Sequence, residues 1–257
     1  MKIISAVSGS SGFTGSHLLE KLKSMGHQIK RIDRDGYFEG YADWIFDLGS
    51  YGNLYGQTDK KEIYKANVTK LRNLLKNKNF KALVYVSSSS VGLKVQTEYS
   101  WAKKTAEGFI SRTRPAVIAR PATVIGPREP SVHLIPKLIK SCLYGEKMPF
   151  VPGPAHDFVD IRDLVDALIL IAEKADDNRG LIFNIGNGTP IANWQIKDLV
   201  EEVTGRKANI DIVDSMRPYD SKVWKVDNSR LVKLGWKPKH TLKQSIFNMV
   251  TEYLPGV

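Results

Sequence analysis

The beginning of the chain constrains the fold most, because a short apolar run, three glycines and a helical pattern follow one another without a gap. Residues 3–7 are too few for a helix and suit a strand buried on both faces of a parallel sheet. Gly9, Gly12 and Gly15 come next, and leucines then recur with helical spacing over residues 18–22. Glycines allow a sharp turn and let backbone N–H groups at a helix N-terminus approach a pyrophosphate. In this strand–turn–helix context, they predict a dinucleotide site.

A second predicted strand, residues 28–32, ends at Asp33. The offset from Gly15 is 33 − 15 = 18 residues, close to the roughly 20 expected for the acid that binds an adenosine ribose. A carboxylate there accepts ribose hydroxyl groups and repels a 2′-phosphate, which predicts NAD rather than NADP. Arg34 could neutralise such a phosphate, so NADP stays open as the alternative.

The following segments alternate between apolar runs and helical patterns. Residues 44–48 and 82–86 are further strand candidates, and residues 60–77 have helical periodicity. The small residues 49–52 and four serines at 87–90 follow the two strands, where a parallel sheet usually meets its ligand. The alternation predicts an α/β fold with a doubly wound parallel sheet, the Rossmann type.

Tyr99 and Lys103 are four residues apart in a helical pattern, so they share one face of the helix. A lysine there can lower the pKa of the phenol by Coulomb attraction, which allows proton exchange near neutral pH. The same spacing also occurs in surface pairs without function, so the pair needs its context.

Composition narrows the class of protein. Cys142 is the only cysteine of 257 residues, which excludes an internal disulfide and predicts a reducing compartment, the cytoplasm. No apolar run approaches the roughly 18 residues that span a bilayer, so we expect no membrane partner. The net charge of +11 contains no block of five or six like charges, which favours a lysine-rich surface over a nucleic-acid partner. A basic cleft for an anionic small molecule would fit the same charge.

The order of glycine loop, Asp33, serine-bearing strand end and Tyr-x-x-x-Lys resembles the extended short-chain dehydrogenase/reductase family. Within it, the chain is similar to the NAD-dependent nucleotide-sugar epimerase/dehydratase branch, that is, to UDP-glucose 4-epimerase-like proteins in a shortened form. The resemblance covers almost the whole chain and continues through residues 119–128, 135–145, 157–164, 183–188, 217–220 and 234–238. The glycine and Tyr/Lys motifs are family-wide, whereas this C-terminal series is specific to the nucleotide-sugar branch.

The resemblance implies a division of the chain into two parts. Residues 1–125, with 154–186 returning to them, would form the dinucleotide-binding Rossmann domain. Residues 126–153 and 187–257 would form a smaller substrate-binding part. Between Asp33 and Trp44 there is no room for the strand and helix that usually come third, so we expect the sheet to be one strand short at an edge.

The resemblance also implies the site residues. Tyr99 would be the acid/base; Lys103 would lower its pKa and hold the nicotinamide ribose; Ser88 would bind the reacting oxygen, with Ser89 as second choice. The implied cofactor contacts are Gly9, Ser11, Gly12, Phe13, Thr14, Gly15, Asp33, Arg34, Leu48, Gly49, Ser50, Asn67, Tyr99, Lys103, Pro121 and Val124. The implied substrate contacts are Ser88, Ser89, Thr123, Phe150 and Arg217, the last through a guanidinium suited to a diphosphate.

Several alternatives stay open at these positions. Asn67 could equally have a buried capping or kink role, and Arg217 could be a structural loop arginine. Glu107 is expected to be an exposed helix acid that pairs with a lysine. His156 stands where the branch commonly has an arginine. Asp157 and Asp163 match family residues that bind no metal, so no metal site is expected.

The expected activity is that of an NAD-dependent nucleotide-sugar epimerase, most like a 4-epimerase that acts through a transient keto-sugar. Ser89 and Ser90 stand where dehydratases commonly have Asp-Glu, which argues against water elimination. The alternatives are an NAD(P)H-dependent nucleotide-keto-sugar reductase and a non-catalytic cofactor-binding relative. A two-fold homodimer is expected through the helices 60–77 and 99–112, because Phe109 and Ile110 exceed the needs of one core face.

Overall fold

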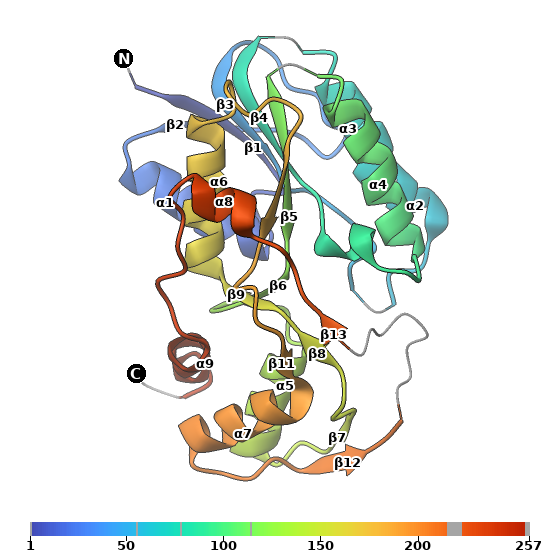
Figure 1. Ribbon diagram of the computed structural model, residues 1–257, viewed down its shortest axis with the longest axis vertical. Coiled ribbons are helices and arrows are strands. Elements are labelled where there is room, and N and C mark those ends of the chain that lie inside the picture. Colours follow the sequence, from blue (N-terminus) through green and yellow to red (C-terminus); the bar gives the residue numbers. More distant parts are fainter. Residues whose placement is uncertain (1, 55, 78, 114, 215–222, 255–257) are drawn as a thin grey trace.

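The computed structural model describes residues 2–54, 56–77, 79–113, 115–214 and 223–254. Its centre is a six-stranded sheet in the order β10-β5-β4-β3-β1-β2, with every neighbouring pair parallel (Figure 1). The strands are β1 (Ile4–Ser8), β2 (Gln28–Arg31), β3 (Ala42–Asp47), β4 (Phe80–Val86), β5 (Ala116–Pro121) and β10 (Ile182–Ile185). The order reverses between β1 and β3, which confirms the predicted doubly wound sheet.

Helices cover both faces of this sheet (Figure 1). One face carries α1 (Phe13–Ser24), α6 (Ile161–Glu173) and α8 (Ser229–Lys233); the other carries α2 (Lys60–Tyr64), a π turn (Lys65–Thr69), α3 (Lys70–Leu74) and α4 (Glu98–Ile110). The four central strands are largely apolar because helices bury both faces of the sheet there, whereas the edge strand β2 is polar and partly exposed. The predicted helix over residues 60–77 is present as α2 and α3, and the π turn separates these two segments.

The sheet is shortened at the β2 edge, as the sequence predicts. Residues 32–41, all of them described, connect β2 directly to β3 without a strand or helix. β2 pairs with β1 alone, whereas β3 lies on the other side of β1. The carboxyl ends of β1, β2 and β3 consequently meet at one edge of the sheet.

Asp43 ties the start of β3 to β1 and gives a testable pH dependence. Its carboxylate accepts the Ile4 N–H at 2.9 Å, the Tyr41 hydroxyl at 2.7 Å and the Lys81 ammonium at 2.8 Å. Burial would raise its pKa, but these donors outweigh burial and lower the pKa from 3.8 to about 2. The stabilisation is thus complete above the unfolded pKa and is lost as pH falls toward 2. A shift of this size corresponds to roughly 2 kcal/mol.

We therefore expect Asp43→Asn to lower the free energy of unfolding by about 2 kcal/mol at pH 7 and to flatten the stability curve below pH 4. Urea unfolding at pH 7 and pH 3 measures both effects. Asp211→Asn is the control, because the Asp211–Lys147 pair is exposed and is worth little. Parallel pH curves for the wild type and Asp43→Asn would contradict the assignment.

The C-terminal part has a core of its own beneath the sheet (Figure 1). Its helices are α5 (Leu134–Tyr144), α7 (Asn193–Thr204) and α9 (Leu242–Thr251), and its short strands pair as β6 (Thr123–Ile125) with β9 (Phe158–Asp160), β7 (Met148–Phe150) with β12 (Ile210–Ile212), and β8 (Ala155–His156) with β11 (Ile191–Ala192) and β13 (Val223–Trp224). Leu231 and Trp236 instead pack with the sheet and α6. The expected assignment of all of 187–257 to the substrate part therefore differs from the structure.

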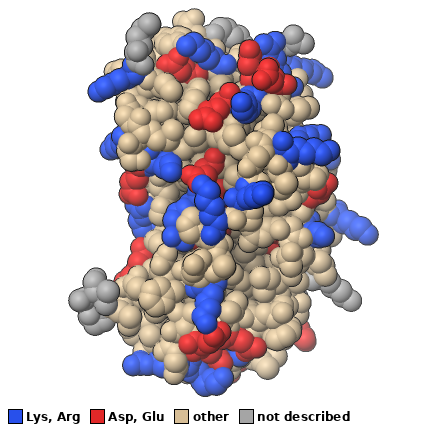
Figure 2. Space-filling view, turned by 60° about the vertical axis from the view of Figure 1, so that its left-hand side comes forward, with Lys and Arg blue, Asp and Glu red and all other residues tan. Residues whose placement is uncertain are grey.

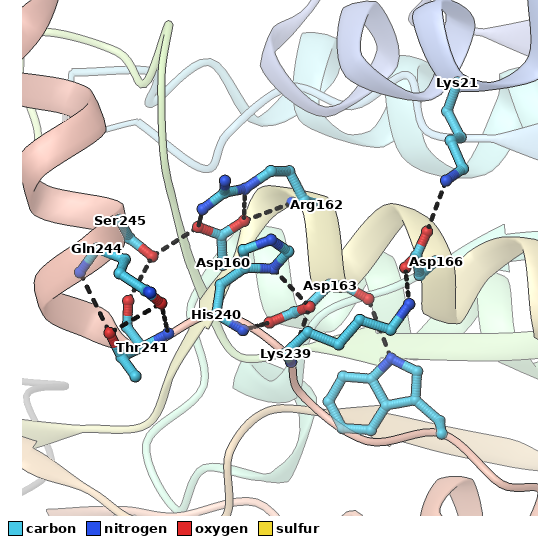
Figure 3. A network of polar contacts seen from close by, with 11 residues as sticks. Lys21, Asp160, Arg162, Asp163, Asp166, Lys239, His240, Thr241, Gln244 and Ser245 are labelled. Atoms are coloured by element: carbon cyan, nitrogen blue, oxygen red, sulfur yellow. Dashed lines mark hydrogen bonds and ion pairs between the residues drawn. The ribbon is translucent and has the colours of Figure 1, made fainter. Parts of the chain in front are cut away.

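A polar network joins this C-terminal segment to α6 (Figure 3). The Asp163 carboxylate accepts the N–H groups of Lys239 and His240 at 3.1 and 3.0 Å, and its carbonyl accepts the Trp236 indole N–H at 3.1 Å. Asp160, which caps the start of α6, also accepts the Ser245 hydroxyl of α9. Residues 236–245 are thereby fixed to the middle of the chain.

One face of the molecule can be followed for the distribution of its charges (Figure 2). On the face that Figure 2 shows, Lys and Arg side chains alternate with Asp and Glu and leave no broad basic patch. None of the helices in the described ranges is both long and apolar enough to cross a bilayer.

Candidate active site

The glycine loop between β1 and α1 has the geometry of a phosphate cradle. Gly9 has φ +63°, and a Cβ on it would lie 2.6 Å from the Gly49 nitrogen; a Cβ on Gly15 would lie 2.8 Å from the Ser10 Cα and would overlap the Gly9 carbonyl. The cap residue of α1, Gly12, offers no side chain, and the first turn contains no acidic residue. The first N–H groups and the positive end of α1 are therefore available to an anion. This cradle fits the pyrophosphate of a dinucleotide.

The remaining predicted cofactor contacts after β1 and β2 differ in their exposure. Ser11 is exposed, whereas Phe13 and Thr14 are half-buried in the first turn of α1. Asp33 follows β2 and is exposed; its Oδ1 accepts the Tyr37 N–H at 2.8 Å. That bond holds the carboxylate in place and uses one of its two oxygens, so the second suits a ribose hydroxyl. Arg34 is exposed beside it.

The loop after β3, residues 48–50, lies directly against the glycine loop. The Gly49 N–H donates to the Ser8 hydroxyl at 3.0 Å, and Gly49 itself leaves no room for a Cβ on Gly9. Leu48 and Gly49 are half-buried, and Ser50 is exposed. The structure thus brings together the predicted contacts from the ends of β1, β2 and β3.

Tyr99 and Lys103 project from one face of α4, as predicted. A capping box between Thr97 and Ser100 starts the helix immediately before the tyrosine. Lys103 is 1% exposed, and its ammonium donates to the Val86 carbonyl at 2.8 Å and lies 5.8 Å from the centre of the Tyr99 ring. Tyr99 is half-buried, and its helix contacts the turn that follows β4.

The pKa values of this pair differ from the expectation. Burial raises the pKa of Tyr99 to about 12, and a hydrogen bond with the Ser50 side chain opposes that rise. Burial first, and the positive charge of Lys70 second, lower the pKa of Lys103 to about 7. The protein groups alone thus do not lower the pKa of the Tyr99 phenol.

The four serines take different positions at the end of β4. Ser87 is buried, whereas Ser88, Ser89 and Ser90 are half-buried; Ser88 caps the turn Ser89–Gly92, which contacts α4. The Ser88 oxygen accepts the Ser90 N–H at 3.1 Å and the Ser90 hydroxyl at 2.9 Å. Neither of these two bonds uses the hydroxyl hydrogen of Ser88.

Glu107 is not the exposed acid that the sequence suggests. It is buried in α4, where it accepts the Ser87 hydroxyl at 2.6 Å and both guanidinium arms of Arg120, at 2.7 and 2.5 Å. Its partner is therefore an arginine in a bidentate pair rather than a lysine on the surface. The expectation was wrong because Arg120 comes from a neighbouring strand, β5.

Asn67 has the kink role that the sequence left open. It is buried in the π turn, where its side-chain amide donates to the Ile63 carbonyl at 2.8 Å and to the Tyr51 carbonyl at 2.7 Å. Both donors of the amide are thereby used to shape the helix and to hold the loop after β3. A cofactor contact would have to use its oxygen, which has no partner among the described residues.

The predicted substrate residues lie in different environments. Thr123 is half-buried where β5 passes into β6, as are the predicted cofactor contacts Pro121 and Val124 beside it, and the Thr123 N–H donates to the Asp157 carbonyl at 3.0 Å. Phe150 is 2% exposed and packs in the core of the C-terminal part, which corrects its predicted contact with a nucleotide. Arg217 lies outside the described residues.

His156 lies near two aromatic rings in the C-terminal part. The His156 ring lies 5.6 Å from the Trp224 ring and 6.4 Å from the Phe158 ring, centre to centre. Within the described ranges, no three His, Cys, Asp or Glu side chains come together as metal ligands would.

Two buried residues of the crevice were not predicted. Asp47 ends β3, and Lys70 begins α3; their side chains form an ion pair at 2.6 Å beneath Gly49. A signal did exist in the sequence, since Lys70 lies three residues after Asn67 and four before Leu74, on the apolar side of the helix.

Known proteins share this fold and parts of this sequence. The chain is 25% identical to a UDP-glucose 4-epimerase of Lactobacillus helveticus over 93% of both chains. It is 29% identical to a probable GDP-L-fucose synthase of rice over 55% of this chain and 46% of that protein, so it spans about half the length of some curated relatives. A Thermotoga maritima UDP-glucose 4-epimerase, solved with UDP-glucose, superposes with a TM-score of 0.87 over 98% of both chains at 21% identity. The sequence profile of the "NAD dependent epimerase/dehydratase family" matches residues 6–186. Together with the cradle and the Tyr99–Lys103 pair, this match shows that the chain belongs to the NAD-dependent epimerase/dehydratase family, among the extended short-chain dehydrogenases/reductases that resemble UDP-glucose 4-epimerase.

Proposed function

We propose that the protein is an NAD-dependent nucleotide-sugar epimerase, most like a 4-epimerase that acts through a transient keto-sugar. The observation that carries the proposal is the position of Tyr99 and Lys103 on α4, beside the serine turn at the end of β4. The full-length match to a UDP-glucose 4-epimerase supports the same activity.

In this proposal, Tyr99 takes the proton of a sugar hydroxyl and later returns it to the oxygen of the keto-sugar. Ser88 donates a hydrogen bond to the reacting oxygen, with Ser89 as second choice, and Lys103 holds the nicotinamide ribose. NAD supplies the hydride acceptor. The glycine loop, Asp33 and the loop 48–50 would hold the rest of the cofactor, in the cradle described above.

The substrate in this proposal is a nucleotide diphosphate sugar. Thr123 and Arg217 are the side chains that we propose for its sugar and its diphosphate. A guanidinium suits phosphate oxygens through its two parallel N–H donors. Phe150 does not belong to this set, because it is part of the core.

A reductase of nucleotide-keto-sugars is the second candidate. The match to a probable GDP-L-fucose synthase favours it, and so does the missing third strand, which leaves the adenine side of the crevice more open. A reductase must exchange its cofactor at each turnover, whereas an epimerase regenerates it.

One incubation separates the two candidates. The protein is incubated with candidate UDP- and GDP-sugars and a catalytic amount of NAD. We expect stereoisomers of the sugar to form without a net change in the absorbance of reduced nicotinamide. Stoichiometric consumption of NADH by a keto-sugar, with no isomer formed otherwise, would replace the epimerase by the reductase. No conversion of any nucleotide sugar, in a protein that binds NAD, would instead identify a non-catalytic relative.

NAD is expected to bind more tightly than NADP. The exposed Asp33 carboxylate is fixed by the Tyr37 N–H and repels a 2′-phosphate, while Arg34 offers only a flexible, solvated counter-charge. Calorimetric titration with both cofactors gives the two dissociation constants. Asp33→Asn is expected to bring the dissociation constants for NAD and NADP closer together. Tighter binding of NADP than of NAD by the wild type would contradict the preference for NAD.

We further propose a two-fold homodimer through α2 and α4. The exposed side chains of Tyr64 and Trp101 supply apolar surface on these helices, and Phe109 is half-buried. Ile110, which the sequence assigned to this surface, is fully buried in the core and does not contribute. We expect light scattering to give the mass of a dimer at micromolar concentration and Trp101→Glu to give a monomer. A wild-type monomer would end the proposal.

A further inference from the structure

Lys70 is a buried lysine that the proposed mechanism does not use. It is 5% exposed, its ammonium donates to the Gly49 carbonyl, and it pairs with Asp47 Oδ1 at 2.6 Å. Asp47 is 1% exposed. The Ser8 hydroxyl joins the cluster, since it donates to Asp47 and accepts the Gly49 N–H at 3.0 Å. One ammonium thus links the start of α3 to the ends of β1 and β3.

The three loops of the proposed cofactor crevice contact Lys70, two of them directly and the glycine loop through Gly49. A Cβ on Gly49 would lie 2.9 Å from the Lys70 ammonium, and a Cβ on Gly36, in the loop of Asp33, would lie 2.9 Å from the Lys70 carbonyl carbon. The glycine loop touches Lys70 through Gly49, because a Cβ on Gly9 would lie 2.6 Å from the Gly49 nitrogen. A shift of Lys70 would therefore displace the pyrophosphate cradle, the ribose acid and the loop 48–50 together.

The π turn Lys65–Thr69 places Lys70 in this position. It inserts one wide turn directly before the lysine, and its Asn67 side chain anchors it to the Tyr51 carbonyl. Single π turns inside α-helices are frequently found at functional sites. The turn and the buried lysine that it positions thus point to the same crevice.

Stability alone does not account for a buried ion pair here. Removing two charges from water is costly, and apolar residues of similar volume are often as stabilising as a buried pair. Lys70 also adds a second buried cation near Lys103, and its charge contributes to the lowered pKa of that lysine. In some proteins, buried polar or charged groups of this kind fix one arrangement of their surroundings.

We propose that Lys70 is a positioning residue of the dinucleotide site, whose ion pair with Asp47 holds the loop 48–50 against the glycine loop and the Asp33 loop, so that the crevice is formed before the cofactor binds. The inference rests on the proposed function, because it requires a dinucleotide in this crevice. Lys70 acts through Gly49 and Ser8 rather than by touching the reacting atoms.

The test replaces the pair rather than one partner. Lys70→Met alone leaves the Asp47 carboxylate buried and unpaired, which can prevent folding. The double variant Lys70→Met with Asp47→Leu keeps the volume and removes both charges. Lys197→Met with Glu201→Leu is the matched control, because Lys197 pairs with the buried Glu201 at 3.3 Å in α7, in the other core. The dissociation constant for NAD is measured by calorimetry, and Tm by thermal unfolding without cofactor.

We expect the double variant to melt within a few degrees of the wild type and to bind NAD at least about tenfold more weakly, a loss of about 1.4 kcal/mol. The control is expected to keep the wild-type affinity even if its Tm falls. A folded double variant with wild-type affinity for NAD would overturn the positioning role and leave the proposed function intact. A wild-type protein that binds neither NAD nor NADP would overturn the proposed function, and the positioning role with it.

Discussion

Replacing Tyr99 by phenylalanine is expected to lower turnover by about 10² to 10⁴, the usual contribution of a general acid–base group. The change removes one hydroxyl from a half-buried ring and leaves the packing of α4 in place. NAD affinity and Tm should therefore stay close to wild-type values. Steady-state rates with the nucleotide sugar that the wild type converts, together with calorimetric NAD binding, measure the three quantities.

Tyr85→Phe is the matched control for this prediction. The Tyr85 ring lies 4.9 Å from the Lys103 ammonium, and its buried hydroxyl has no partner among the described residues. Loss of that hydroxyl costs no hydrogen bond, so turnover and stability should be unchanged or slightly improved. A Tyr99→Phe enzyme with more than half the wild-type rate would remove Tyr99 from the mechanism.

Gly15→Ala is expected to abolish cofactor binding. The added methyl would overlap the Gly9 carbonyl and lie 2.8 Å from the Ser10 Cα, and these are backbone atoms that cannot rotate away. The glycine loop must then move from β1 and from the N-terminus of α1, which destroys the cradle for the pyrophosphate. We expect no measurable NAD binding, together with a lower Tm.

Gly108→Ala serves as the control for the loss of a glycine. Gly108 lies in α4, is exposed, and would have no atom within 4 Å of its new Cβ. Alanine in an exposed helix is expected to add roughly 0.5–1 kcal/mol of stability and to leave NAD binding unchanged. Normal NAD affinity in Gly15→Ala would show that the cradle is not where the cofactor binds.

Local patterns allowed the sequence to predict the main elements. The glycine loop, the strand before it and the helix after it are contiguous, so spacing alone predicts their arrangement. Tyr99 and Lys103 share a helix face for the same reason. The missing third strand follows from chain length, because ten residues between β2 and β3 cannot form a strand and a helix.

Buried charge pairs were harder to predict, because their partners are distant in sequence. Lys70 lies on the apolar side of its helix and Glu107 resembles an ordinary surface residue, but the burial of both depends on Asp47 and Arg120, which lie on strands of the sheet. The π turn was hidden as well, since one extra residue barely disturbs the helical spacing of leucines. Phe150 fits an apolar ligand site and an apolar core equally well, and only packing distinguishes the two.

The chain contributes residues alternately to the core of the sheet and to the core of the C-terminal part, here called the second core, and this order has a consequence for synthesis on the ribosome. The second core already contains residues from Ile125 to Phe158, but it closes only when Met249 and Val250 of α9 arrive. The interval is 250 − 158 = 92 residues, or roughly 5 to 18 s at elongation rates of about 5–20 residues per second. During that time α7 and β12 arrive and cover α5 and β7 in part, but the second core stays incomplete until α9 is present. Chaperones that bind nascent chains therefore have a defined target, the incomplete second core, and a defined moment of release, the emergence of α9.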